Sequence, residues 1–262
     1  MNKLHRFAAA AAAAACFAGA AHATPLSTDV TDLWFNPDES GWGLSLYQQQ
    51  GTVFAVLFVY GADNQPTWYV ASSLQAGEVN GNLAFSGALY RTNGPYFGGA
   101  FNPAGVGIRQ VGTATFTLAS LTSGNFSYGV DGVNVTKSVT RQTWAINNMS
   151  GRYLGGQSGT YSACAGLDGT RDEAGTVTVS QGGSGATVSI ATATATCTYN
   201  GAYAQSGHYG LLSGSYSCSN GRTGSFSAFA LDSQIGSLAG RIDTVGSDGC
   251  RYSGRLGGIR AS

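Results

Sequence analysis

Hydrophobic and polar positions alternate in short segments along most of the chain, which predicts β-strands rather than helices. Residues 43–50 place Leu44 and Leu46 between polar neighbours, and residues 52–60 form a nearly continuous apolar run. Alternation with period two is typical of a half-buried strand, and a short apolar run bounded by turn residues is typical of a buried one. The same reasoning predicts further strands at residues 67–73, 82–90, 107–118, 125–130 and 135–144.

Turns rich in Gly, Asn and Asp separate these segments, and the first half keeps no helical period over more than one turn. Residues 61–64 (Gly-Ala-Asp-Asn) are one such turn, and residues 91–105 are expected to form one long loop. Short strands at this spacing predict a meander that closes into a barrel or sandwich. We therefore expect an all-β chain with two small antiparallel meander barrels or sandwiches in tandem.

The composition of the chain changes near residues 147 and 148. All four tryptophans lie before this point, and four of the five cysteines lie after it. This predicts an aromatic-rich domain over residues 24–147 and a disulfide-bonded domain over residues 148–262. One continuous sheet whose two ends differ in composition is the alternative.

The second half contains an internal repeat, with copies at residues 158–203 and 213–256. The sequence SGTYSAC of the first copy matches SGSYSC of the second, and CTYNG matches CRYSG. The cysteines fall in register, because nearly equal lengths of chain separate the two cysteines of each copy. Each copy is expected to supply about three strands, so that two copies form a sheet of about six strands that curls on itself.

The N-terminus has the pattern of a secretory signal peptide. Lys3 and Arg6 precede an alanine-rich apolar run over residues 7–17, and residues 21–23 (Ala-His-Ala) place small side chains where signal peptidase reads them. The apolar run is shorter than the roughly 20 residues that a membrane-spanning helix needs.

We expect cleavage after Ala23, which leaves Thr24 as the first residue of a periplasmic or secreted protein. One alternative is a lipoprotein acylated at Cys16, although Ala13 stands where such sites usually carry a large aliphatic residue. A short N-terminal anchor is the other alternative.

Four cysteines in an exported chain predict two disulfides, with three possible connectivities. Adjacency in the sheet favours the nested pairing Cys197–Cys218 with Cys164–Cys250, because disulfides join Cα atoms about 4.4–6.8 Å apart. Pairing within each copy, Cys164–Cys197 with Cys218–Cys250, is the alternative. A zinc site is disfavoured, since no Cys-x-x-Cys spacing and no histidine cluster accompanies these cysteines.

Removal of the leader leaves a chain of low charge. Lys+Arg falls from 13 to 11 against 13 Asp+Glu, so the net charge is near −2, and Lys137 is the remaining lysine. Nucleic-acid binding needs clustered cations that displace counterions, so we expect no nucleic-acid partner. We also expect no integral membrane segment after signal cleavage, because no later stretch is long and apolar enough.

Side chains suited to catalysis are few. His208 is the one histidine after the leader, and its Gly-rich surroundings predict a solvated loop residue. One histidine excludes multi-histidine zinc and iron sites, and no Gly-x-Ser-x-Gly nucleophile turn, phosphate loop or dinucleotide fingerprint is present. We therefore expect no metal and no cofactor, and the sequence favours a binding protein over an enzyme.

Aromatic side chains crowd into residues 34–69. Trp34-Phe35 and Trp68-Tyr69 are neighbouring pairs, and neighbouring side chains of a strand face opposite sides of the sheet. Some of these rings are therefore expected outside the core, where they could line a barrel mouth, stack on a sugar or meet the second domain.

The same stretch reads WFNPDESGWGLSLYQQQGTVFAVLFVYGADNQPTWYV. It resembles a module that recurs in exported proteins of proteobacteria, with an Asn-Pro-x-Glu-Ser-Gly-Trp-Gly pattern followed by Gln and by Pro-x-Trp-Tyr. The second half resembles another small exported β module, which is marked by Cys-x-Tyr-Ser-Gly. These resemblances imply architecture and compartment but no activity. The motif positions in this chain are Asn36, Pro37, Glu39, Ser40, Gly41, Trp42, Gly43, Gln49, Pro66, Trp68 and Tyr69.

We expect an exported, non-catalytic binding or interaction module whose ligand is a glycan or a small apolar molecule. A carboxylate-dependent hydrolase is one alternative, with Glu39 as its best candidate and Glu78 or Asp63 as a second carboxylate. A structural or inhibitory envelope protein that acts through the loop at residues 91–105 is another. The motif also has a purely structural interpretation, in which Glu39 stabilises a turn that the tryptophans clamp. The candidate ligand-binding residues are Trp34, Glu39, Trp42, Gln49, Trp68 and Tyr69.

Overall fold

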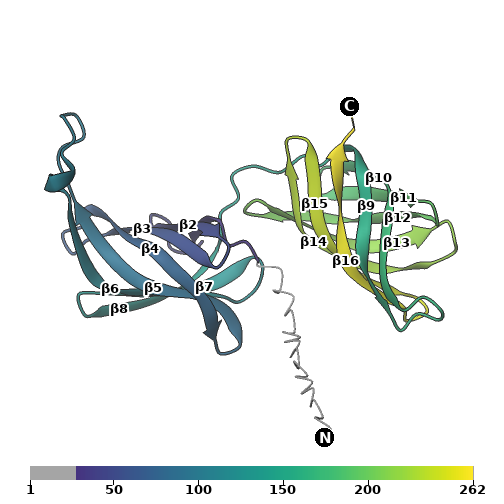
Figure 1. Cartoon of the computed structure of the whole chain (residues 1–262), viewed down its shortest axis with the longest axis horizontal. Coiled ribbons are helices and arrows are strands. Elements are labelled where there is room, and N and C mark those ends of the chain that lie inside the picture. Colours follow the sequence, from purple (N-terminus) through teal and green to yellow (C-terminus); the bar gives the residue numbers. More distant parts are fainter. Residues whose placement is uncertain (1–27, 262) are drawn as a thin grey trace, which may run out of the picture.

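The computed structural model describes residues 28–261 and confirms the all-β prediction. Two closed barrels of eight antiparallel strands follow one another in the chain. In each barrel every strand pairs with the next one, and the last strand pairs with the first (Figure 1). The expected leader, its cleavage after Ala23 and the lipoprotein alternative at Cys16 lie outside the described residues.

The first barrel begins with a very short strand and closes when the eighth strand pairs with it. Its strands are β1 (Asp32–Phe35), β2 (Gly43–Gln49), β3 (Thr52–Tyr60), β4 (Pro66–Val79), β5 (Asn82–Asn93), β6 (Gly107–Leu118), β7 (Ser123–Val130) and β8 (Val133–Arg141).

Several of these strands differ from the sequence-based prediction, which ended β5 at residue 90 and began β7 at residue 125. The pattern did not predict β1, because its four residues are too few to show a period. β4 continues to Val79 through Ser, Gly and Glu, which are poor strand formers, because β5 pairs with it along this stretch after a bulge. β8 ends at Arg141, before the expected end at Trp144.

The second barrel has eight strands rather than the roughly six expected, so each copy of the repeat supplies four strands and not three. In the first copy residues 169–192 form two strands joined by a two-residue turn at residues 183 and 184, and in the second copy residues 223–246 form two strands joined by a two-residue turn at residues 235 and 236. The strands are β9 (Gly151–Ser162), β10 (Gly169–Gly182), β11 (Gly185–Thr192), β12 (Thr196–Ser206), β13 (Tyr209–Cys218), β14 (Thr223–Gln234), β15 (Ser237–Gly246) and β16 (Arg251–Arg260).

Large side chains fill the interior of both barrels. An eight-stranded barrel has an interior that side chains can just fill. In the first barrel the largest buried side chains are Trp34, Phe85, Phe116, Phe126, Leu44, Leu46, Leu57, Leu74 and Leu89. The second core is rich in tyrosine, and its members include Tyr153, Tyr199, Tyr203, Tyr216, Tyr252, Phe226, Ile190 and Ile242.

Both barrels close with the same arrangement of side chains. In the first, the indole N–H of Trp34 on β1 donates to the carbonyl of Val30, and Arg141 on β8 lies 4.5 Å from the centre of the Trp34 ring. In the second, the hydroxyl of Tyr153 on β9 donates to the carbonyl of Met149. In both barrels the accepting carbonyl lies four residues before the aromatic residue. Arg260 on β16 lies 5.1 Å from the centre of the Tyr153 ring. An arginine of the last strand thus covers an aromatic ring of the first strand at each closure.

Two disulfides cross-link the second barrel in the nested arrangement. Cys197–Cys218 joins the neighbouring strands β12 and β13, and Cys164–Cys250 joins the segments next to β9 and β16. The second bond therefore lies at the closing seam of the barrel.

The segment between the barrels runs from Gln142 to Ser150 and includes the boundary expected at residues 147 and 148. Asn147 donates its backbone N–H to the side chain of Gln205 and its amide N–H to the carbonyl of His208. The connecting segment is therefore bonded to the turn between β12 and β13. Residues 28–261 contain no helix with the length and apolar character needed to cross a membrane.

Candidate functional site

The Asn-Pro-x-Glu motif forms a tight turn between β1 and β2. The side chain of Asn36 accepts the N–H of Asp38, and the carbonyl of Asn36 accepts the N–H of Glu39. Glu39 accepts the indole N–H of Trp42 at 3.0 Å and a hydrogen bond from Lys137 on β8 at 2.8 Å. The hydrogen bond from Lys137, together with that from Trp42, lowers the pKa of Glu39.

This geometry agrees with the structural interpretation of the motif. The carboxylate of Glu39 connects the first turn of the barrel to its last strand. A general acid in a glycosidase needs a raised pKa, so the lowered pKa of Glu39 does not favour that role.

The other predicted site residues are not brought together. Trp34 is completely buried in the first core, and Tyr69 is half-buried against that core. Gln49 at the end of β2 and Trp68 on β4 are exposed on the outside of the barrel. Trp68 and Tyr69 face opposite sides, as expected of neighbours in a strand.

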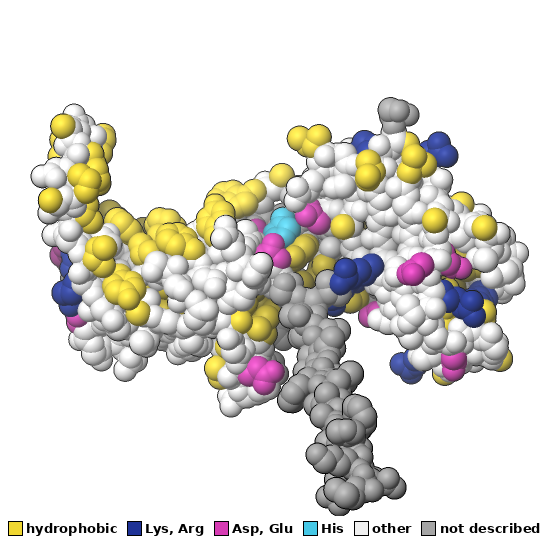
Figure 2. All heavy atoms as spheres, in the orientation of Figure 1, with side chains coloured by type: hydrophobic (Ala, Val, Ile, Leu, Met, Phe, Trp, Pro, Cys, Tyr) yellow, Lys and Arg dark blue, Asp and Glu magenta, His cyan; other side chains and the backbone are white. Residues whose placement is uncertain are grey.

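Trp68 belongs to a set of five aromatic side chains on the outer surface of β2, β3 and β4, which we call the aromatic face. Their side chains are between 40% and 61% exposed. Cross-strand pairing sets Tyr47 opposite Phe54 and Phe58 opposite Trp68, so the rings lie in neighbouring positions. In Figure 2 hydrophobic side chains gather along the upper side of the first barrel. The aromatic face consists of Tyr47, Phe54, Phe58, Tyr60 and Trp68.

A hollow of about 900 Å³ adjoins the aromatic face. Tyr47 and Phe54 line it together with amide and hydroxyl side chains. β2 and β3 carry no charged residue, so the surface around the hollow combines rings with neutral hydrogen-bonding groups. The polar residues that line it are Gln49, Gln50, Thr52 and Ser72.

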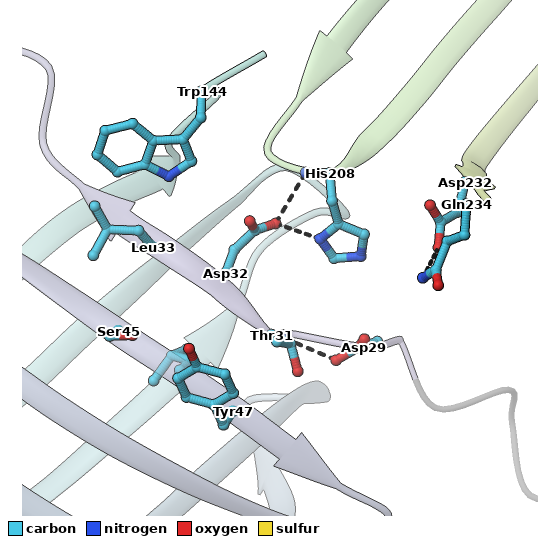
Figure 3. A pocket seen from close by; sticks show the side chains of 11 residues that line it. Asp29, Thr31, Asp32, Leu33, Ser45, Tyr47, Trp144, His208, Asp232 and Gln234 are labelled. Atoms are coloured by element: carbon cyan, nitrogen blue, oxygen red, sulfur yellow. Dashed lines mark hydrogen bonds and ion pairs between the residues drawn. The ribbon is translucent and has the colours of Figure 1, made fainter. Parts of the chain in front are cut away.

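A second hollow, of about 550 Å³, lies between the two barrels (Figure 3). Asp32 and Tyr47 line it from the first barrel, His208 and Asp232 from the second, and Trp144 from the connecting segment. Tyr47 lines both hollows, so the aromatic face continues into the space between the barrels.

The expectation that His208 is a solvated loop residue was wrong. Its Nδ1 lies 2.7 Å from the Asp32 carboxylate, and its backbone N–H donates to the same oxygen. Because a carboxylate only accepts hydrogen bonds, Nδ1 of His208 carries the proton. Only 31% of the His208 side chain is exposed.

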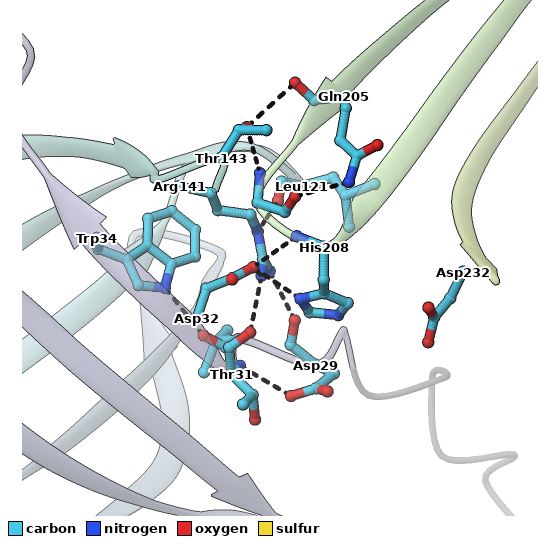
Figure 4. Close-up of polar contacts among 12 residues, drawn as sticks. Asp29, Thr31, Asp32, Trp34, Leu121, Arg141, Thr143, Gln205, His208 and Asp232 are labelled. Atoms are coloured by element: carbon cyan, nitrogen blue, oxygen red, sulfur yellow. Dashed lines mark hydrogen bonds and ion pairs between the residues drawn. The ribbon is translucent and has the colours of Figure 1, made fainter. Parts of the chain in front are cut away.

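Arg141 also takes part in the contact between Asp32 and His208 (Figure 4). Its completely buried side chain donates to the Asp32 carboxylate at 2.7 Å and to the carbonyls of Thr31, Asp29 and Leu121. Burial opposes ionisation of Asp32, but the hydrogen bonds from His208 and Arg141 outweigh burial and lower its pKa.

Arg141 also connects the two barrels through aromatic rings. The guanidinium lies 4.5 Å from the centre of the Trp34 ring in the first barrel and 4.9 Å from that of Tyr209 in the second. The charge of a buried arginine is thus compensated by one carboxylate, three carbonyls and two ring faces.

Gly207 allows the β12–β13 turn to approach the first barrel this closely. Its φ is +60°, and a Cβ at this position would overlap the Asp32 carboxylate and lie 2.9 Å from Cβ of Arg141. Any other residue would require the turn, the Asp32 side chain or one of the barrels to shift.

A carboxylate bonded to a histidine also orients the base of many hydrolases. Among residues 28–261 no serine, threonine or cysteine is hydrogen-bonded to the other ring nitrogen of His208. The Asp32 oxygen that binds the imidazole also binds Arg141. These contacts therefore connect the two barrels, and we use the name latch for the cluster of Asp32, Arg141 and His208. Within the same described range, no cluster of three or more His, Cys, Asp or Glu side chains could hold a metal ion.

The latch is not evident in the sequence because its members are far apart in the chain. Asp32, Arg141 and His208 stand in unremarkable local sequences, and only the pairing of β1 with β8 brings Asp32 beside Arg141. The available signal was that two acidic residues, Asp29 and Asp32, stand within five residues of Trp34.

The chain matches no protein-family model, and a comparison with curated proteins finds no match either.

Proposed function

We propose that this protein is a non-catalytic binding module that holds a neutral polysaccharide on its aromatic face. The observation that carries the proposal is the exposure of five aromatic side chains on strands whose outer side normally carries polar residues.

The chemistry of the surface supports a sugar ligand. The faces of aromatic rings are electron-rich, and they attract the partly positive C–H groups of a sugar ring. Gln49, Thr52 and Ser72 supply donors and acceptors for hydroxyl groups beside Tyr47 and Phe54. Since β2 and β3 carry no charge, a neutral glycan is favoured over an acidic one.

The other ligand considered, a small apolar molecule, has less support. Such a ligand would need an open apolar interior, but Trp34, Phe116 and Phe126 are buried at the centre of the first barrel. The hydrolase alternative also has less support, because Lys137 and Trp42 both bind the Glu39 carboxylate.

Affinity electrophoresis through gels that contain soluble neutral glucans or chitin oligosaccharides tests this function. An acidic polysaccharide, polygalacturonate, serves as the charged comparison. We expect retardation by a neutral glycan and at least tenfold weaker binding by the Phe58→Ala/Trp68→Ala variant, because a stacked ring contributes roughly 1 kcal/mol.

The matched control is Phe97→Ala, which removes an exposed ring outside the aromatic face. This variant should bind as the unchanged protein does. Equal loss in both variants, or no retardation by any neutral glycan, would contradict the proposal.

A further inference from the structure

The hairpin between β5 and β6 extends away from the first barrel as a separate arm (Figure 1). It projects at the end of the molecule remote from the second barrel. We use the name arm for residues 91–109. This segment includes the loop expected at residues 91–105, but its base consists of paired strands.

The charged residues of the arm lie at its base, and the rest of the arm carries none. From Thr92 to Ile108 the sequence contains no charged residue. Arg91 and Arg109 bound this stretch and lie directly opposite one another in the hairpin. Arg109 forms an ion pair with Asp131 through its two terminal guanidinium nitrogens, so Arg91, Arg109 and Asp131 together keep one net positive charge at the base of the arm.

The charge-free part of the arm exposes large apolar side chains. Phe97 is 90% exposed, and Tyr96, Phe101 and Ile108 are each exposed by two thirds or more. In Figure 2 hydrophobic side chains cover much of the arm where it stands clear of the barrel. Isolated exposed apolar residues are common on soluble proteins, but four on one projecting hairpin indicate a contact surface.

The tip of the arm has a defined structure of its own. A single 3₁₀ turn at Pro103–Gly105 is capped by the side chain of Asn102, which accepts the N–H of Ala104. Gly99 donates to the carbonyl of Tyr96, and the Tyr96 and Phe97 rings lie 4.8 Å apart. The aromatic rings are therefore presented on an ordered loop, which reduces the entropy lost on contact.

We propose that the arm inserts its aromatic tip into the interfacial region of a lipid bilayer, with Arg91 and Arg109 at the level of the lipid phosphates. Aromatic side chains prefer this region because their rings are apolar while the surroundings remain partly wet. Arginine side chains bind phosphate at the depth where the apolar layer ends. The contact is peripheral and requires no crossing of the membrane.

A bilayer fits these features better than a pocket on a protein partner. Between its two arginines the arm offers no charged group that could pair with a complementary protein surface. Arg91 and Arg109 are instead paired across the hairpin, at the same distance from its tip, and a bilayer presents its phosphates in one such layer. This inference does not depend on the proposed glycan site, which lies on β2, β3 and β4.

Co-sedimentation with lipid vesicles tests the proposal on the protein from residue 24 onward. We expect binding to mixed phosphatidylcholine and phosphatidylglycerol vesicles, and weaker binding to phosphatidylcholine alone, because of the net positive charge at the base. The Phe97→Ser/Phe101→Ser variant should bind the mixed vesicles about tenfold or more weakly, since two rings lose their burial.

The Phe58→Ala/Trp68→Ala variant is the control, and its vesicle binding should be unchanged. A Phe97→Trp variant provides a direct readout, because brominated lipids should quench its added fluorescence if the tip enters the bilayer. Absence of vesicle binding, equal loss in the control or no quenching would overturn the proposal, and the arm would then be assigned to a protein partner.

Discussion

The carboxylate of Asp32 lies 2.7 Å from Nδ1 of His208, although 176 residues separate them in the chain. Asp32 belongs to the first strand of the first barrel, and His208 to a turn of the second. The contact joins two barrels that each have a complete hydrophobic core. The relative orientation of the barrels therefore depends on this latch and on the hydrogen bonds of the connecting segment, and not on a shared core.

The first prediction concerns the buried charge of Arg141. Asp32→Asn keeps the shape of the side chain but removes the charge that compensates a completely buried guanidinium. Breaking such a pair costs about 3 kcal/mol, so we expect this loss in the free energy of unfolding of the first barrel at neutral pH, measured by urea denaturation. The control is Asp131→Asn, which breaks an exposed pair with Arg109 and should cost much less, because solvent screens exposed ion pairs. Equal effects of the two substitutions would contradict the role given to the latch.

The second prediction concerns pH. The folded protein holds the pKa of Asp32 below its usual value, near 3.9 in an unfolded chain. Its contribution to stability is therefore complete above about pH 4 and is lost as the pH falls through the lower folded pKa. We expect the melting temperature to fall more steeply as the pH drops below about 4 in the unchanged protein than in Asp32→Asn. Glu39 and Asp131, whose pKa values are also lowered, are present in both proteins and cancel in this comparison.

The third prediction separates backbone strain from the clash at the latch. Gly207 and Gly183 have almost the same positive φ, +60° and +59°, but only Gly207 faces the first barrel closely. Alanine at either position should cost about 1–2 kcal/mol for the left-handed backbone. Gly207→Ala should in addition force the barrels apart, which small-angle X-ray scattering would record as a larger maximum dimension. An unchanged scattering profile would show that the turn can shift without breaking the latch.

The fourth prediction compares the two disulfides. Cys164–Cys250 closes a loop with a sequence separation of 86 residues, and Cys197–Cys218 one of 21. In the chain-entropy treatment the longer loop stabilises the fold by about 1 kcal/mol more. Urea denaturation of the Cys164→Ala/Cys250→Ala and Cys197→Ala/Cys218→Ala variants should therefore show the larger loss for the first. The reverse order would indicate that the Cys197–Cys218 bond supports packing that loop entropy does not describe.

The sequence predicted the parts of the fold that depend on local pattern. The period-two alternation identified the strand at residues 43–50, the apolar run identified the strand at residues 52–60, and the long gap with Gly and Pro predicted the loop at residues 91–105. It did not identify β1, whose four residues acquire a strand conformation only by pairing with β2 and β8. The number of strands expected in the repeat was also too low, although the Gly- and Ser-rich residues 180–185 do separate β10 from β11 in the sequence.

The candidate site was predicted less well for a related reason. Alternation indicates that Trp68 and Tyr69 face opposite sides, but it does not tell which side is the core. Trp34 therefore proved to be a core residue, while Phe54 and Phe58, which were not among the candidates, lie on the aromatic face. The latch depends on contacts between distant segments, and a single sequence carries no record of such pairing.

The closing arginines have a consequence for the order in which the chain can fold. Arg141 and Arg260 lie on the last strands of their barrels, so neither aromatic ring is covered until the whole barrel has emerged. Such long-range closure is slow, and the open seam exposes unpaired strand edges in the meantime. The first barrel can complete its closure while the second is still emerging, but the Cys164–Cys250 bond must wait for β16. A protein that stalls before residue 250 would thus present a finished first barrel attached to an open, unpaired sheet, which quality-control proteases and chaperones can recognise.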